Sequence, residues 1–138
     1  MAGDPELPKV LVVENDGGTR DALTIILRPF CEVYVATTAA DAFAVLKERA
    51  IDLVTLEIKL PDRSGIEVLQ EIKRTHPEVE VILITAYGTP ASALAGLHHG
   101  AAGYLMKPFN VIELVRLVEQ TMMQKKQTSL SDRSLASQ

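Results

Sequence analysis

The sequence predicts an α/β fold in which a doubly wound parallel sheet of five strands carries helices on both faces. Short apolar runs rich in β-branched residues alternate along the chain with segments of helical period. The joints between them carry turn or capping residues. Each connection between consecutive strands is about a dozen residues or longer, which is the length that a right-handed crossover between parallel strands requires.

Five strands and five helices are expected. The predicted strands are residues 9–14, 32–36, 52–56, 79–85 and 103–106, and several are apolar at successive positions, as a sheet covered on both faces demands. The predicted helices are residues 18–28, 39–49, 65–75, 90–99 and 111–123. In the last of these, apolar residues recur with helical spacing, and Asn110 is placed to cap its first turn. Pro29, Pro77 and Gly100 are expected to end the first, third and fourth helices.

The length of 138 residues fits one domain. We expect this domain to occupy residues 9–123. Residues 124–138 are rich in Ser and Gln and contain two isolated leucines, so we interpret them as a disordered tail or a linker stub.

Composition excludes several classes of protein. A single cysteine, Cys31, allows no internal disulfide and no thiolate metal cluster, which predicts a cytoplasmic protein. The first eight residues do not form a signal peptide, and no apolar run approaches the roughly 18 residues of a membrane span. The net charge of −4 argues against binding of nucleic acid by this domain.

Polar side chains gather where the predicted strands end. The residues at these joints are Glu14, Asn15 and Asp16 after the first strand, Glu57 after the third, Thr85 and Ala86 after the fourth, and Lys107 and Pro108 after the fifth. In a doubly wound sheet the carboxyl ends of the strands form the ligand-binding edge. Carboxylates, a hydroxyl and a lysine suit a divalent cation or a phosphoryl group. Pro108 favours a tight turn, compatible with a cis peptide bond, that directs Lys107 back across this edge.

Four ordered motifs give the chain a resemblance to a known family. They are LVVEND near the start, LEIKLPDRSGIEVL in the middle, ITAYG, and GAAGYLMKPF near the end. Over nearly all of residues 9–123 the chain resembles the receiver domain of bacterial two-component response regulators. The resemblance implies a flavodoxin-like fold with strand order 2-1-3-4-5 and a switch operated by phosphorylation of an aspartate.

The departures from the family pattern decide the functional prediction. Glu57 stands where the family has its phosphoacceptor aspartate, and Glu14 and Asn15 stand where receivers carry an acidic pair. Thr85, Lys107 and Tyr104 match the family's switch threonine, invariant lysine and rotating aromatic residue.

Glu57 is one methylene longer than aspartate, which displaces its carboxylate from the position that in-line attack on a phosphoryl donor requires. Asn15 removes charge from a magnesium site that would use Glu14, Asn15 and Glu57, so we expect Mg²⁺ binding to be weakened or lost and no other cofactor. A buried carboxylate requires a partner, and we expect Glu57 to pair with Lys107 and also with Lys59.

Three interpretations of Glu57 stay open: a mimic of the phosphorylated state, an inactive site kept as an ion pair, or a solvated loop carboxylate. We predict an atypical receiver, or pseudo-receiver, that is not an enzyme and acts in phosphorelay signalling as a phosphorylation-independent protein-interaction module. Its partners would be a histidine kinase, an effector domain or a second copy, bound through the fourth helix, the fifth strand and the fifth helix. This face includes Leu94, Leu97, His98, Tyr104, Val111 and Arg116.

Two different functions also stay open. In the first, the domain still binds Mg²⁺ and is phosphorylated at Glu57 or at a neighbouring acid such as Asp16. In the second, it is a flavodoxin-like cofactor-binding protein in which residues 17–19 form a phosphate-binding turn, although Glu14 and Asp16 would repel an anionic cofactor. Asp62 is expected to be a turn residue and not a second phosphoacceptor.

Overall fold

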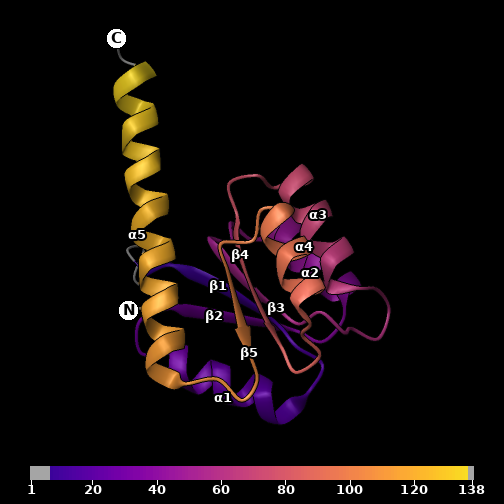
Figure 1. Ribbon diagram of the computed structural model, residues 1–138. Coiled ribbons are helices and arrows are strands. Elements are labelled where there is room, and N and C mark those ends of the chain that lie inside the picture. The colour runs from indigo at the N-terminus through magenta and orange to yellow at the C-terminus, as the bar shows by residue number, and fades with distance from the viewer. Residues whose placement is uncertain (1–6, 137–138) are drawn as a thin grey trace.

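The computed structural model describes residues 7–136 and contains one five-stranded parallel sheet (Figure 1). The strands are β1 (Lys9–Val13), β2 (Glu32–Ala36), β3 (Leu53–Leu56), β4 (Glu80–Thr85) and β5 (Gly103–Met106). Their order across the sheet is β2-β1-β3-β4-β5, and every pair of neighbours is parallel. The predicted doubly wound, flavodoxin-like sheet is therefore confirmed.

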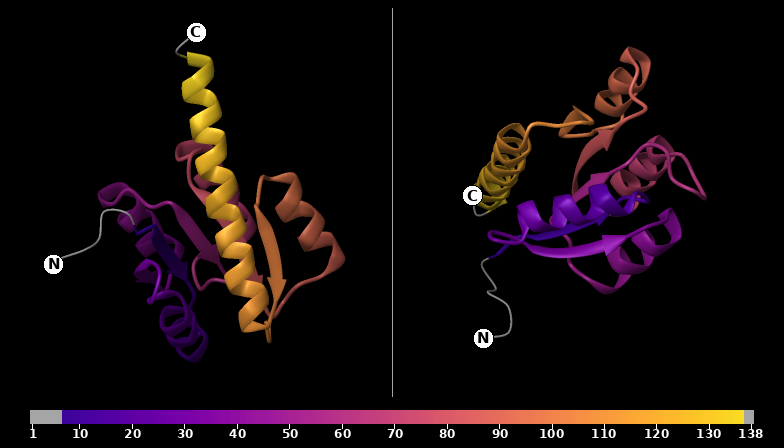
Figure 2. Two further views of the ribbon diagram at one scale, coloured as in Figure 1. Left: turned by 90° about the vertical axis from the view of Figure 1, so that its left-hand side faces the viewer. Right: turned by 90° about the horizontal axis from the view of Figure 1, so that it is seen from below.

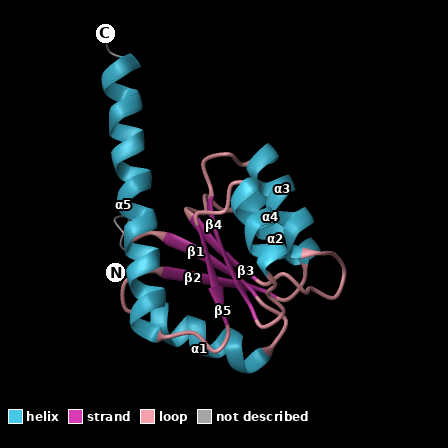
Figure 3. Ribbon diagram, viewed as in Figure 1, coloured by secondary structure: helices cyan, strands magenta, loops and turns pink. Residues whose placement is uncertain are grey.

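Within residues 7–136, five helices cover the two faces of this sheet (Figure 3). They are α1 (Gly17–Leu27), α2 (Ala39–Glu48), α3 (Gly65–Thr75), α4 (Pro90–His98) and α5 (Val111–Ala136). Helices α1 and α5 lie on one face, and α2, α3 and α4 lie on the other (Figures 1 and 3). Two buried apolar clusters separate the layers. Leu23 and Leu114 belong to the α1 and α5 side, and Leu46 and Leu69 belong to the opposite side.

The element boundaries follow from local signals. Nine of the ten elements begin and end within one residue of the ranges expected from the sequence. Asn110 accepts a hydrogen bond from the backbone N–H of Glu113, so it caps α5 as predicted. Gly100 follows α4 with a φ of +94°, a left-handed conformation that glycine adopts without the steric cost of a Cβ.

The tenth element, α5, corrects a prediction. Residues 124–138 are expected to be a disordered tail or a linker stub. The helix continues past Met123 to Ala136, which contradicts disorder over residues 124–136, while the linker stub stays a prediction and residues 137–138 lie outside the described range. The segment 124–136 contains no Gly or Pro, and its Gln and Lys residues favour a helix. Lys125 also anchors it, because its ammonium donates to the carbonyl oxygens of Asp52, at 3.3 Å, and Glu78.

The extended part of α5 leaves the sheet and runs beyond the rest of the domain (Figure 2). Among residues 7–136, no helix combines the length and the apolar character that crossing a membrane requires. Cys31 lies in the core, where burial, together with the nearby Asp52 carboxylate, raises the pKa of its thiol to about 11.

Gly65 allows α3 to begin close to the end of β3. Its backbone N–H donates to the carbonyl oxygen of Ile58 at 2.5 Å. A Cβ at this position would overlap the backbone carbonyl of Glu57 and the Cα of Ile58. Because both obstacles are backbone atoms, they cannot move aside without displacing the loop that follows β3.

We therefore predict that Gly65→Ala lowers the free energy of unfolding by about 2 kcal/mol, as overpacking a tight contact does. Gly18→Ala is the matched control, because Gly18 is also helical and a Cβ there would meet its nearest atom at 3.5 Å, an ordinary contact. Urea unfolding followed by circular dichroism measures both variants. Equal stabilities for the two variants would contradict the close approach at Gly65.

Candidate functional site

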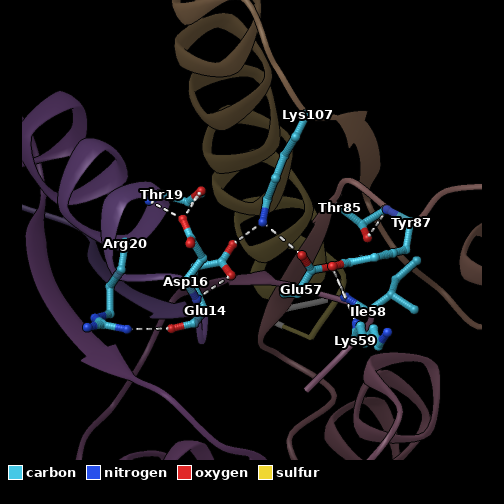
Figure 4. Close-up of polar contacts among 10 residues, drawn as sticks. All are labelled: Glu14, Asp16, Thr19, Arg20, Glu57, Ile58, Lys59, Thr85, Tyr87 and Lys107. Atoms are coloured by element: carbon cyan, nitrogen blue, oxygen red, sulfur yellow. Dashed lines mark hydrogen bonds and ion pairs between the residues drawn. The ribbon is translucent and has the colours of Figure 1, made fainter. Parts of the chain in front are cut away.

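Three charged side chains from different strand ends meet at the carboxyl edge of the sheet (Figure 4). Glu14 directly follows β1, Glu57 directly follows β3 and Lys107 directly follows β5. Strands β1 and β3 are neighbours, whereas β5 lies at the far edge of the sheet. The lysine therefore reaches from the edge strand back to the two central strands.

The ammonium of Lys107 bridges the two carboxylates. Its Nζ lies 2.5 Å from Oε1 of Glu14 and 2.8 Å from Oε1 of Glu57. Glu14 is 2% exposed and Glu57 is 3% exposed, while the Lys107 side chain is 14% exposed. The expected ion pair between Glu57 and Lys107 is confirmed, and Glu14 adds a second carboxylate to it.

Both oxygens of the Glu57 carboxylate are engaged. Oε1 accepts from Lys107, and Oε2 accepts from the backbone N–H groups of Ile58 at 2.6 Å and Lys59 at 3.3 Å. This environment excludes the interpretation of Glu57 as a solvated loop carboxylate. The carboxylate is instead a buried acceptor held by one ammonium and two amides.

The charges of this cluster also act on the lysine. Burial disfavours the charged ammonium, but its hydrogen bonds to Glu14 and Glu57 and their negative charges outweigh burial and raise the pKa of Lys107 above its usual value. Lys107 is thus a permanent cation between two carboxylates at neutral pH.

Glu14 and Asp16 face different partners. The second oxygen of Glu14 accepts from the backbone N–H of Asp16 at 3.0 Å, and Arg20 donates to the Glu14 backbone carbonyl at 3.0 Å. The Asp16 carboxylate turns to the first turn of α1, where it accepts from the backbone N–H and the hydroxyl of Thr19, both at 2.8 Å. These two bonds lower the pKa of Asp16. Asp16 therefore caps α1 and does not join the ion cluster.

The donor set does not fit a divalent cation. A magnesium ion would need oxygen ligands from Glu14, Asn15 and Glu57, but the two carboxylates are occupied by Lys107 and Asn15 is exposed. Within the described part of the chain, no three carboxylate, imidazole or thiol side chains are arranged to hold a metal ion. In this conformation the Lys107 ammonium supplies the positive charge between the carboxylates.

The expectation that Lys59 pairs with Glu57 is wrong. The Lys59 ammonium lies over the ring of Tyr87, 4.8 Å from its centroid, and only the backbone N–H of Lys59 reaches the carboxylate (Figure 4). The reason is local geometry, because the exposed loop directs this side chain toward the joint that follows β4. Lys59 and Tyr87 thereby connect two loops beside the cluster.

Thr85 and Tyr104 are engaged outside the ion cluster. The Thr85 hydroxyl accepts from the backbone N–H of Tyr87 at 3.0 Å, and the Tyr104 hydroxyl lies 3.0 Å from the Ser92 hydroxyl in the first turn of α4. Ser92 belongs to the capping box that Thr89 forms at the start of α4. Tyr104 therefore connects β5 to the beginning of α4.

The remaining predicted residues border the site. The peptide bond between Lys107 and Pro108 is cis, in agreement with the tight turn expected there. Asp16, Ala86, Lys107 and Pro108 are among the residues that line a depression of about 510 Å³ beside the cluster. Three residues that sequence reasoning did not place in the site also contribute, namely Arg20, Ser92 and Tyr87. Tyr87 lies within the ITAYG motif, whereas no local spacing signals the contact of the Arg20 side chain with the Glu14 carbonyl, six residues earlier.

Comparison with known proteins agrees with the fold and the motifs. The family model of the response regulator receiver domain matches residues 10–119. The chain belongs to this family. It is thus a receiver domain of two-component signalling, and the predicted strand order is that of CheY-like receivers.

Curated relatives of the receiver are longer proteins. The response regulator protein FleR of Pseudomonas aeruginosa is 38% identical over 111 residues, which cover 80% of this chain and 24% of FleR. The regulatory protein VanRc of Enterococcus gallinarum is 34% identical over 118 residues, which cover 80% of this chain and 48% of VanRc. The receiver thus spans about a quarter of FleR and about half of VanRc.

Solved structures extend the similarity to nearly the whole receiver. A receiver domain protein from Methanospirillum hungatei has a TM-score of 0.85 at 28% identity, covering 89% of this chain and 99% of its own. The signal receiver domain of a LuxO repressor protein from Vibrio parahaemolyticus has a TM-score of 0.86 at 28% identity, covering 91% and 97%.

The ion cluster predicts a large effect of removing its cation. Lys107→Gln leaves two buried carboxylates without a counter-charge, so we expect a loss of about 3 kcal/mol in the free energy of unfolding. Adding Glu57→Gln to this variant should recover part of that loss, because one of the unpaired charges is then removed. Urea unfolding of the two single variants and the double variant measures the coupling. Strictly additive losses would contradict a direct ion pair.

The raised pKa of Lys107 predicts how the contribution of this side chain to the free energy of unfolding depends on pH. A group whose pKa is higher in the folded state stabilises the fold fully below its unfolded value, which is near 10.5 for lysine, and loses that contribution as the pH rises through the folded value. The stability advantage of the wild type over Lys107→Gln should therefore be constant below pH 10.5 and shrink above it. Thermal unfolding at a series of alkaline pH values tests this, and a difference that shrinks well below pH 10.5 would contradict it.

Proposed function

We propose that this receiver domain is a pseudo-receiver, which signals through protein interaction without phosphorylation of its pocket and has no enzymatic activity of its own. The observation that carries the proposal is the bridge of Lys107 between Glu14 and Glu57. By resemblance, Glu57 occupies the phosphoacceptor position. Its carboxylate is 3% exposed and both of its oxygens already accept hydrogen bonds.

The buried ion cluster opposes phosphorylation for two reasons. A nucleophilic carboxylate must approach the phosphorus atom of its donor along a defined line, and the longer glutamate side chain is held away from solvent by three donors. The magnesium ion that would neutralise the incoming phosphoryl group has neither a free carboxylate pair nor a third acidic ligand, because Asp16 caps α1.

The same cluster supports an inactive site held as an ion pair over a mimic of the phosphorylated state. A mimic would have to present negative charge to the switch residues. The Glu57 charge is instead neutralised by Lys107, and the Thr85 hydroxyl accepts from Tyr87. The domain would then hold one conformation constitutively.

The interaction surface that we propose is the face of α4, β5 and α5. It exposes several large apolar side chains: Leu94 at 69%, Leu97 at 55%, Met106 at 46% and Val111 at 50%. A cavity of about 680 Å³ on this face is lined in part by Tyr104 and Arg116. Exposed apolar area of this kind is typical of protein-binding surfaces. A histidine kinase, an effector domain or a second copy of the chain would be its partner.

A receiver that still accepts a phosphoryl group is the second candidate function, and the position of Asp16 is the observation that favours it. Asp16 lies at the same edge of the sheet, is exposed, and its lowered pKa keeps it ionised at neutral pH. A flavodoxin-like cofactor site has less support, since the Asp16 carboxylate already occupies the N-terminus of α1 where an anionic phosphate would bind.

Treatment with acetyl phosphate and Mg²⁺ tests the proposal. We expect the wild type to gain no phosphoryl group in intact-mass measurements and to show no NMR shift at Tyr104 when Mg²⁺ or beryllofluoride is added. Glu57→Asp shortens the side chain and is expected to restore a response to both.

The matched controls are Glu57→Gln and Asp16→Asn. If the wild type gains a phosphoryl group and one of these variants does not, that residue is the acceptor and the pseudo-receiver proposal is wrong. A Tyr104 shift in the wild type on addition of beryllofluoride would contradict the proposal in the same way.

A further inference from the structure

The loop between β3 and α3 is tied to a second helix by Asp62. One oxygen of its carboxylate accepts from the backbone N–H of Ala39 at 2.9 Å, and the other accepts from the backbone N–H of Ala40 at 3.0 Å. Both donors belong to the first turn of α2, more than 20 residues earlier in the chain. Asp62 is therefore a turn residue, as expected, whose side chain binds α2.

This contact completes the N-terminus of α2. The helix has its own capping residue, Thr38, whose hydroxyl accepts from the backbone N–H of Asp41. The preceding two amides, those of Ala39 and Ala40, have no acceptor within the helix, because the first turn of any α-helix leaves its N–H groups unpaired. The Asp62 carboxylate supplies both acceptors, and these bonds lower its pKa.

The neighbouring residue makes a second connection to the same helix. The Arg63 guanidinium lies 5.7 Å from the centroid of the Phe43 ring in α2, and it forms an ion pair of 3.0 Å with Glu71 in α3. Two successive loop residues thus contact α2, Asp62 at its backbone and Arg63 at a side chain. The tip of the loop is held between α2 and α3.

The base of the same loop forms part of the ion cluster. The amides of Ile58 and Lys59 donate to Oε2 of Glu57, so the position of these two residues decides where the carboxylate lies (Figure 4). Lys59 and Ser64 form a β-bridge, and the Gly65 amide donates to the Ile58 carbonyl. The loop is closed at its base by these contacts and held at its tip by Asp62.

We propose that Asp62 is a positioning residue, which fixes the loop after β3 on the N-terminus of α2 and so holds the Ile58 and Lys59 amides against the Glu57 carboxylate. It acts on the cluster through the backbone and does not touch Glu57 or Lys107. Helix α2 thereby supports the loop that positions the Glu57 carboxylate, and we call α2 and this loop the frame of the pocket. None of the α2 side chains reaches the ion cluster. The inference that this frame keeps the pocket closed rests on the proposed function.

Amide hydrogen exchange followed by NMR tests the role of Asp62. In Asp62→Ala the amides of Ala39 and Ala40 and those of Ile58 and Lys59 should exchange about tenfold faster than in the wild type, since hydrogen bonds to a charged acceptor are lost. Asp62→Asn keeps one acceptor oxygen without the charge and should give an intermediate rate. Amides in the centre of β1 and β3 serve as the reference for any loss of global stability.

Asp41→Asn is the matched control. Asp41 also carries a carboxylate in the first turn of α2, but its side-chain contact is a 3.4 Å hydrogen bond from the Thr37 hydroxyl within the same segment. Removing its charge changes the field at the helix end by a similar amount without releasing the loop. In Asp41→Asn the Ile58 and Lys59 amides should therefore exchange at the wild-type rate.

A second measurement reports on the cluster itself. Acetylation of lysine side chains by an activated ester, quantified by peptide mass spectrometry, should label Lys107 slowly in the wild type and about tenfold faster in Asp62→Ala, with the exposed Lys126 as internal standard. If Asp62→Ala accelerates exchange at Ala39 and Ala40 but leaves Ile58, Lys59 and Lys107 unchanged, Asp62 is a helix cap alone and the proposal is wrong. Neither measurement uses a phosphoryl donor, so failure of the pseudo-receiver proposal would be detected separately.

Discussion

Two buried carboxylates at the ends of neighbouring strands impose the main electrostatic constraint on this domain. Glu14 and Glu57 lie at the carboxyl edge of the sheet with almost no solvent contact, and such a pair requires a cation between them. Lys107 provides that cation from β5. The bridge therefore connects the edge of the sheet to its centre.

The loops around this bridge are held mainly by backbone hydrogen bonds. Glu57 accepts from two consecutive amides, and Glu14 accepts from the amide of Asp16. Asp16 and Asp62 each bind the first turn of a helix, α1 and α2 respectively. Of the four carboxylates at this edge, two thus pair with Lys107 and two accept from the N-termini of helices, which limits the repulsion between them.

Sequence reasoning succeeded where a signal depends on periodicity or on the position of a residue relative to a strand end. The parallel sheet, its order by resemblance and the pairing of Glu57 with Lys107 belong to this group. Sequence reasoning failed where tertiary contacts determine the direction of a side chain in a loop. Lys59 was expected at Glu57 and instead lies over Tyr87, and the bonds from Asp62 to α2 join residues whose proximity no local pattern encodes. The continuation of α5 to Ala136 depends on the helix propensity of a polar segment, and also on the contact of Lys125 with the Asp52 carbonyl, which is 73 residues distant in the chain and has no local signal.

The length of α5 has a mechanical consequence. At 1.5 Å per residue, its 26 residues span about 39 Å, and its first turns pack beside β5 and α1 while its last turns extend past the sheet. Residues 126–136 lie beyond the contact of Lys125 with the domain and span about 16 Å, so a tilt of about 10° about that contact would displace the end of the helix by roughly 3 Å. The contacts of Lys125 with the carbonyls of Asp52 and Glu78 are the point about which this end of the helix would tilt. A small change in packing between β5 and the first turns of α5 would therefore change the direction in which the end of α5 extends from the domain.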